Sequence, residues 1–219
     1  MLHEMKLNEN PFERMKNGTK TIEFRLNDEK RKKIKIGDKI TFSKLPGLCE
    51  KLTVEVLELY NADTFENLFL KLYNDSKIAK EKAKVMHEIY SEAKEKEFGV
   101  IGIKIKIDTE ELKDKIEKFK PYNEQEEVEK NIILKYFDIF DDVLTRQNEI
   151  GHFTSSSFIL NKERTKMLII YHKIYNSWGW TGGHSDGDSD LLYVAMKEAK
   201  EETGIKHVKP ILNDIYSLE

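Results

Sequence analysis

The sequence has a single cysteine and no long apolar run, and each scarcity excludes a class of protein. Because Cys49 is the only cysteine among the 219 residues, the chain cannot form an intramolecular disulfide, and a reducing compartment is expected. The first residues lack the apolar core of a signal peptide, and no apolar run reaches the length of a membrane span. Hydrophobic residues make up 39% and charged residues 35%, which is polar but sufficient for cores. We therefore expect a soluble, cytoplasmic protein with no membrane partner.

The net charge of −3 conceals an uneven distribution of charge along the chain. Residues 1–121 hold 26 Lys and Arg against 23 Asp and Glu, whereas residues 122–219 hold 11 against 17. A basic half followed by an acidic half indicates two domains with different partners. Residues 109–120 are charged and helical in pattern, and Pro121 interrupts them, so this segment is the expected linker.

Apolar periodicity predicts a mixture of strands and helices in both halves. In the first half we expect a helix at 11–18, strands at 21–26, 39–43, 51–60 and 98–107, and helices at 65–73 and 78–91. In the second half we expect a helix at 124–136, strands at 153–160, 166–172 and 177–181, a helix that ends at Thr203, and a strand at 211–218. The fold class is therefore α+β.

Three charged residues stand out near the start of the chain. On a strand that begins at Thr21, Glu23 and Arg25 share one face, and Lys20 directly precedes that strand. Such a group at the mouth of a barrel could bind a phosphate and the edge of a base. A surface ion pair is the competing interpretation, and both remain open. The basic run at residues 30–35 could likewise contact phosphates or simply be solvated.

Several short motifs in the first half together resemble an ASCH domain, a small β-barrel related to the PUA fold. The motifs are Asn10-Pro11-Phe12, residues 18–25, Lys30-Arg31, Ile36-Gly37-Asp38 and residues 98–103. The resemblance implies binding of RNA or a modified nucleoside. One branch of that family removes an acyl group from an acetylated cytidine with a lysine and a threonine. Lys20 matches the lysine, but Glu23 stands in place of the threonine, so this activity is not carried over.

An acidic, glycine-rich loop at residues 182–190 leads into the last expected helix. Glu198, Glu201 and Glu202 are spaced i, i+3 and i+4, so their carboxylates project from one helix face. Like charges so close repel one another, and a hard divalent cation would neutralise them. An ordinary acidic surface helix is the alternative.

Residues 183–205 resemble the Nudix box. The residues that match its pattern are Gly183, Glu198, Glu201, Glu202, Gly204 and Ile205. Ser189 stands where the family has a glutamate, with Asp188 and Asp190 beside it, and Lys197 replaces the family's arginine.

The resemblance implies a hydrolase that uses Mg²⁺ or Mn²⁺ to cleave a nucleoside diphosphate linked to another group. Glu198, Glu201 and Glu202 would hold the metal, with Glu201 as the base that takes a proton from water. Lys197 would orient a glutamate. The backbone of Gly182 and Gly183 would approach the diphosphate. Trp180 could stack on a base or could only pack.

These expectations combine into a PUA/ASCH-like β-barrel at residues 1–107 and a Nudix-like α/β/α module at residues 108–219. Only 14 residues follow Ile205, so we expect that module to lack C-terminal strands. The leading function is Nudix-type hydrolysis of a nucleoside-diphosphate-linked pyrophosphate, with the first half binding RNA or a modified nucleoside. The alternative is a nucleic-acid- or nucleoside-binding protein with an inactive Nudix-like scaffold. The Glu-x-x-Glu-Glu spacing favours the enzyme, whereas Ser189 and the short C-terminal segment favour the scaffold.

Overall fold

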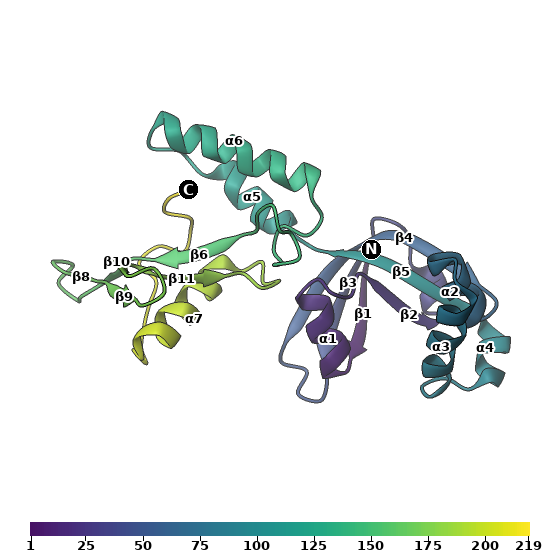
Figure 1. The fold of residues 1–219 in the computed structure, drawn as a ribbon. Helices are drawn as coiled ribbons and strands as arrows, with labels where there is room; N and C mark the ends of the chain where they lie inside the picture. Colours follow the sequence, from purple (N-terminus) through teal and green to yellow (C-terminus); the bar gives the residue numbers. More distant parts are fainter. The chain divides into compact units, whose positions relative to one another are not determined.

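The chain folds into two compact units, and a computed structural model describes all residues 1–219 (Figure 1). One unit contains Met1–Met15 and Thr19–Ile107, and the other contains Lys16–Gly18 and Asp108–Glu219. None of the helices combines the length and apolar character that crossing a membrane requires. Each unit is described by itself below.

The N-terminal unit is built on one five-stranded sheet. Its strands are β1 (Leu2–Leu7), β2 (Ile22–Leu26), β3 (Lys39–Lys44), β4 (Lys51–Ala62) and β5 (Val100–Ile107). They lie in the order β1-β3-β4-β5-β2, with β1 parallel to β3 and the other neighbours antiparallel. Its helices are α1 (Glu9–Lys16), the 3₁₀ helix η1 (Arg31–Lys33), α2 (Phe65–Tyr73), α3 (Ser76–His87) and α4 (Glu92–Phe98).

The two outer strands of this sheet, β1 and β2, are connected by hydrogen bonds from long basic side chains. Arg25 Nη2 on β2 donates to the carbonyl oxygen of Lys6 on β1 at 2.9 Å. Lys30 Nζ, just after β2, donates to the carbonyl oxygen of Glu4 at 2.7 Å. Strands at opposite ends of a flat sheet could not be linked in this way, so the sheet curls into a half-barrel. This confirms the mixed α+β class and the PUA-like shape expected of the first half.

Apolar residues on the inner face of the sheet and on the helices form the core. Ile40, Phe42, Val54, Val56 and Ile103 are completely or almost completely buried, as the alternation of each strand predicts. A second cluster packs α2 and α3 against the ends of β2 and β5, with the buried members Leu26, Phe65, Leu68, Phe69, Ala79, Ala83 and Val100. The C-terminal end of β2 is therefore anchored in the core at Leu26.

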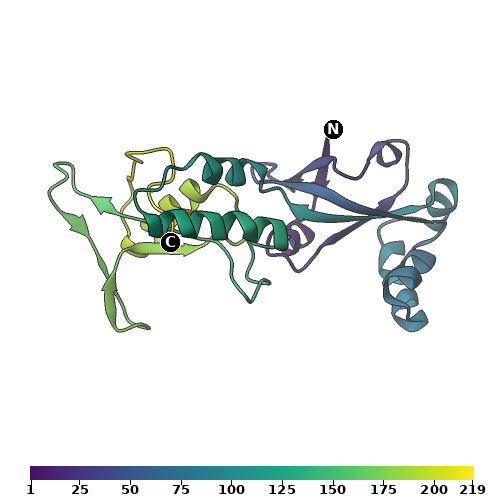
Figure 2. The same ribbon diagram turned by 90° about the horizontal axis from the view of Figure 1, so that it is seen from above.

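The C-terminal unit is made of short ladders and three helices. The helices are α5 (Glu110–Lys118), α6 (Glu124–Ile139) and α7 (Leu191–Thr203). The strands are β6 (Thr154–Ser157), β7 (Ile159–Leu160), β8 (Met167–Leu168), β9 (Ile170–His172), β10 (Ser177–Gly179) and β11 (Thr181–His184). They form three antiparallel two-stranded ladders, β6 with β11, β7 with β8 and β9 with β10. Figure 2 shows α5 and α6 running side by side.

The structure corrects the expected elements at three places. The segment 109–120, expected as a helical linker, does form a helix, α5, but this helix buries Leu112 and Ile116 and so belongs to the C-terminal unit. Residues 211–218 form no strand, since only Leu218 among them is buried and no neighbouring strand pairs with them. Residues 2–7, where no strand was expected, form strand β1. The ladders do not join into the continuous sheet of an α/β/α module, so that part of the expected fold is not shown.

Candidate functional site

Lys20, Glu23 and Arg25 form one cluster at strand β2. Glu23 Oε2 lies 2.7 Å from Lys20 Nζ, and Glu23 Oε1 accepts a hydrogen bond from Arg25 Nε at 2.6 Å. The Glu23 side chain is only 4% exposed, and those of Lys20 and Arg25 are each 18% exposed. The structure therefore brings together the three residues that the strand period places on or beside one face. A solvated surface pair does not describe this group, because its carboxylate is buried.

The cluster keeps its charges. Burial lowers the pKa of Arg25, but the charge of Glu23 and the hydrogen bonds to Glu23 and Tyr90 outweigh it, so the pKa is raised overall. Glu23 Oε2 is buried and lies 2.7 Å from Lys20 Nζ, so the ammonium group of Lys20 is its partner within the protein. A carboxylate oxygen has two lone pairs, so Oε2 has room for one further N–H group from a ligand.

A polar hollow of about 710 Å³ opens at the end of β2. Its lining includes Asn27, Asn61, Asn67, Lys71, Lys96 and Phe98. The side-chain oxygen of Asn27, the residue directly after β2, is buried and has no hydrogen-bond partner. Side-chain amides can pair with base edges, and ammonium groups can pair with phosphate. The residues that line this hollow are therefore of the kinds that bind nucleotides.

Residues 5–108 match the ASCH domain family. The N-terminal half of the chain is an ASCH domain. Its curled sheet carries the Lys20–Glu23–Arg25 cluster on β2, where the sequence motifs placed it. The match ends at residue 108 and does not extend into the C-terminal half.

Two solved structures resemble the part of the chain that contains the ASCH domain. The crystal structure of hypothetical protein PH0355 is 36% identical over 49% of this chain and 100% of that chain, with a TM-score of 0.43. The solution structure of protein PF0455 from Pyrococcus furiosus is 34% identical over 49% of this chain and 97% of that chain, with a TM-score of 0.38. No curated protein matches the chain.

The basic run after the ASCH domain's β2 is largely held by the protein itself. Arg31 pairs with Asp28 at 2.7 Å and Lys32 pairs with Glu29 at 2.7 Å, while Lys30 donates to a backbone carbonyl. These contacts fit the solvated, structural interpretation of the run better than a row of free phosphate ligands. The cluster on β2 is thus the stronger candidate for a binding site.

The acidic helix of the C-terminal unit packs against the glycine strand β11. Asp190 caps α7 by accepting a hydrogen bond from Tyr193 N, and Gly204 ends it in the left-handed conformation at φ 73°. Glu202 Oε2 accepts a hydrogen bond from Gly182 N at 3.0 Å. A Cβ atom at Gly183 would lie 2.5 Å from the carboxyl carbon of Glu198, so any larger residue there would displace this carboxylate. Two carboxylates of the helix, those of Glu198 and Glu202, therefore lie against strand β11.

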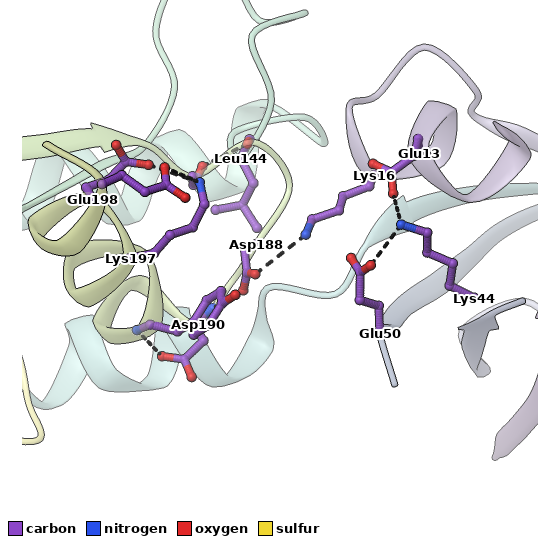
Figure 3. Close-up of polar contacts among 12 residues, drawn as sticks. Glu13, Lys16, Lys44, Glu50, Leu144, Asp188, Asp190, Lys197 and Glu198 are labelled. Carbon is purple, nitrogen blue, oxygen red and sulfur yellow. Dashed lines mark hydrogen bonds and ion pairs between the residues drawn. The ribbon is translucent and has the colours of Figure 1, made fainter. Parts of the chain in front are cut away.

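Lys197 neutralises part of this acidic face (Figure 3). Its Nζ lies 3.1 Å from Glu198 Oε1 and 3.5 Å from Glu201 Oε2, and the hydrogen bond to Glu198 raises its pKa. Glu201 is 59% exposed, whereas Glu198 is 17% exposed. No three His, Cys, Asp or Glu side chains converge in a way that could hold a metal. The roles expected for Mg²⁺ or Mn²⁺, Glu201 and Lys197 stay predictions, and we derive no step through a metal.

A histidine pair beside this helix escaped the sequence analysis. His152 Nδ1 lies 3.1 Å from the carbonyl oxygen of Asn148, and His152 Nε2 lies 2.8 Å from His184 Nδ1. Because a carbonyl oxygen only accepts, the neutral pair has a hydrogen on each Nδ1 and leaves His184 Nε2 as an acceptor. Burial, then the charges of Arg146 and His152, lower the pKa of His184. The pairing of β6 with β11 brings the two histidines together, and no local pattern in the sequence predicts this contact.

Trp180, expected as a substrate contact, lies between β10 and β11 and is 41% exposed. Its ring makes an edge-to-face contact with Phe158 at a centroid distance of 5.3 Å. The structure therefore shows partial packing together with an accessible ring, and the stacking role of Trp180 stays a prediction.

Proposed function

We propose that the ASCH domain binds RNA or a modified nucleoside at the Lys20–Glu23–Arg25 cluster. The observation that carries the proposal is the buried Glu23 carboxylate, which lies between the cationic groups of Lys20 and Arg25. Two fixed positive groups beside a carboxylate can bind a phosphate and an amino group of one ligand. The family assignment supports the same class of ligand.

Each member of the cluster has a distinct part in this proposal. Lys20 and Arg25 supply charge to phosphate or to a base carbonyl, and Arg25 is held in place by its hydrogen bond to Lys6 O. Glu23 Oε2 accepts a hydrogen bond from an exocyclic amino group, as carboxylates do when they bind cytosine. The ligand N–H group would share Oε2 with Lys20, since a carboxylate oxygen has two lone pairs.

The test measures binding of the full chain to a short fluorescein-labelled RNA by anisotropy at several salt concentrations. We expect saturable binding that weakens with salt, because phosphate contacts release counterions. Lys20→Ala with Arg25→Ala should weaken it strongly. Lys32→Ala with Lys33→Ala is the matched control, since it also removes two positive charges but leaves the cluster intact. Equal affinity for both double variants, or no saturable binding at low salt, would exclude the cluster as the binding site.

A competition experiment tests the role of Glu23. We expect cytidine to displace the labelled RNA better than uridine does, because only cytosine offers an amino group to Glu23 Oε2. Glu23→Gln should remove that preference while retaining the size of the side chain. A preference that survives Glu23→Gln would show that another group reads the base.

We propose as a second candidate that the C-terminal half is a Nudix-type, metal-dependent hydrolase of a nucleoside diphosphate derivative. The observation that favours it is the contact of Glu198 and Glu202 with Gly182 and Gly183, which joins the two ends of the matching motif in space. Binding without hydrolysis, with this half as a scaffold, is the alternative. The metal would have to displace Lys197 from its carboxylates.

Calorimetric titration of Mg²⁺ or Mn²⁺ into the full chain distinguishes these two possibilities. Ser189→Glu should tighten metal binding by supplying the missing carboxylate, and Glu202→Ala should weaken it by removing a ligand. Formation of the nucleoside monophosphate from a panel of nucleoside diphosphate derivatives should then depend on Glu201. Equal metal affinity in all three proteins would mean that the acidic face is no metal site.

A further inference from the structure

The two tryptophans of the chain lie in one exposed, apolar segment of the C-terminal unit. This segment, residues 158–180, contains the hairpins β7–β8 and β9–β10 and is named here the aromatic hairpins. The β7–β8 hairpin extends away from α5, α6 and α7 in Figure 1, and in Figure 2 both green hairpins extend away from the helices of this unit. The most exposed large side chains of the aromatic hairpins are Ile174 at 92%, Tyr175 at 77% and Trp178 at 66%. Such a concentration of exposed apolar side chains marks an interaction surface.

The aromatic rings in this segment meet edge to face. Tyr171 contacts Trp178 at a centroid distance of 5.3 Å and an interplanar angle of 63°. Phe158 contacts Trp180 at 5.3 Å and 70°. An edge contact covers at most one face of each ring, so the rings retain flat faces on which another planar group could stack.

The charge of the aromatic hairpins is opposite to that of the surrounding unit. Residues 158–180 contain four Lys and Arg and a single acidic residue, although the C-terminal half as a whole is acidic. The basic residues are Lys162, Arg164, Lys166 and Lys173, and all of them are exposed. Exposed rings interleaved with cations have the composition of a surface that binds single-stranded nucleic acid, where bases stack and phosphates meet lysine and arginine.

We propose that the aromatic hairpins bind single-stranded nucleic acid by stacking bases on Trp178 and its neighbouring rings. The apolar faces alone would fit a protein partner equally well, but the local positive charge within an acidic unit favours a polyanion. This surface is separate from the Lys20–Glu23–Arg25 cluster and lies in the other unit. The proposal therefore stands whether or not the ASCH domain binds RNA.

Intrinsic tryptophan fluorescence reports on this surface alone, because the chain contains no tryptophan outside it. We expect saturable quenching when an unlabelled oligouridylate of about ten nucleotides is added to the full chain, since stacked bases quench indole emission. Trp180→Phe, which leaves Trp178 as the single reporter, should keep the quenching. The double variant Lys20→Ala with Arg25→Ala should also keep it with unchanged affinity. That result separates this proposal from the proposed function of the ASCH domain.

Affinity measured by anisotropy with the labelled form of the same RNA tests the contribution of stacking. Trp178→Ala should weaken binding to this surface about 5- to 150-fold, the range expected for the loss of one stacked base. Trp178→Tyr should restore most of the affinity. These measurements use the Lys20→Ala, Arg25→Ala background so that only the aromatic hairpins are observed.

Two controls distinguish stacking from apolar docking. Ile174→Ala removes the most exposed apolar side chain of the same hairpin and should leave RNA affinity unchanged. Lys166→Ala should reduce the salt dependence by about one phosphate contact. An affinity unchanged by Trp178→Ala would overturn the proposal. So would a concentration-dependent dimer, seen by light scattering, that both Ile174→Ala and Trp178→Ala dissolve, because the occupant would then be a second copy of the chain.

Discussion

Replacing Glu23 with glutamine is expected to destabilise the ASCH domain far more than the same replacement at Glu58. Both carboxylates pair with lysine on the same sheet, but Glu23 is 4% exposed and Glu58 is 47% exposed. Removing one member of a buried ion pair costs about 3–5 kcal/mol, whereas an exposed pair contributes about 0–1 kcal/mol. Because Lys20 and Arg25 each keep some exposure to solvent, we expect the lower end, about 3 kcal/mol, at Glu23.

Hydrogen exchange of the β5 amides measures this difference within the ASCH domain. Ile103 lies opposite Glu23, and Ile101 lies opposite Arg25 in the β2–β5 ladder, so both amides report on this part of the sheet. A loss of about 3 kcal/mol corresponds to exchange that is roughly 100-fold faster when opening is at equilibrium. Glu58→Gln should change the rate less than tenfold. Similar exchange rates in the two variants would refute the argument that burial increases the contribution of the Glu23 ion pairs to stability.

Two further predictions concern buried carboxylates of the same domain. Hydrogen bonds from the N-terminal amino group and from His3 hold the pKa of Asp38 below its usual range. The ionised Asp38 therefore contributes its full stabilisation well above pH 4. This stabilisation is lost as the pH falls from about 3.9, the pKa of an unfolded aspartate, towards the lower pKa of Asp38 in the folded protein. The urea midpoint of the wild type should therefore fall in acid, and that of Asp38→Asn should fall less. Glu95 accepts a hydrogen bond from Phe65 N at the first residue of α2, and Glu95→Gln should cost about 1–3 kcal/mol by urea unfolding. The same change at the exposed Glu97 should cost little, and equal costs would show that the buried contact is unimportant.

Much of the ASCH fold could be predicted because local signals and tertiary packing agree. Helix α2 begins and ends where expected, since Thr64 accepts a hydrogen bond from Asn67 N and Asn74 adopts the left-handed conformation at its end. Strand β1 could not be predicted so easily. Its inward position at His3 is polar and is buried only because Asp38, far away in the sequence, accepts its hydrogen bond.

The composition of the candidate site followed from the strand period, but its burial did not. A period of two places Glu23 and Arg25 on one face whatever the surroundings are. Their low exposure depends on contacts that only the curled sheet creates, such as the hydrogen bond from Arg25 to the carbonyl oxygen of Lys6 on β1. Because β1 was missed, the choice between a surface pair and a buried cluster could not be made from the sequence.

In the C-terminal half, helical spacing places Glu198, Glu201 and Glu202 on or near one side of α7. The spacing does not determine what each carboxylate contacts, however. Glu202 accepts a hydrogen bond from Gly182 N, Glu198 lies against Gly183, and Glu201 is mostly exposed. Carboxylates on one side of a helix need not converge on one point where a metal ion could bind. The match to the motif alone therefore does not establish a metal site.

The length of an RNA ligand should decide whether the two proposed surfaces act on one strand. An oligocytidylate long enough for a single surface binds each unit independently, so the Lys20→Ala, Arg25→Ala variant retains the wild-type concentration dependence of tryptophan quenching. A strand long enough to reach both surfaces makes the second contact intramolecular, which raises the affinity of both. In that regime the same variant should shift the quenching midpoint to higher RNA concentration, although its substitutions lie in the other unit. Titrating oligocytidylates of increasing length into the wild type and the variant measures where the two curves separate. Curves that coincide at every length would show that the two surfaces never share a strand.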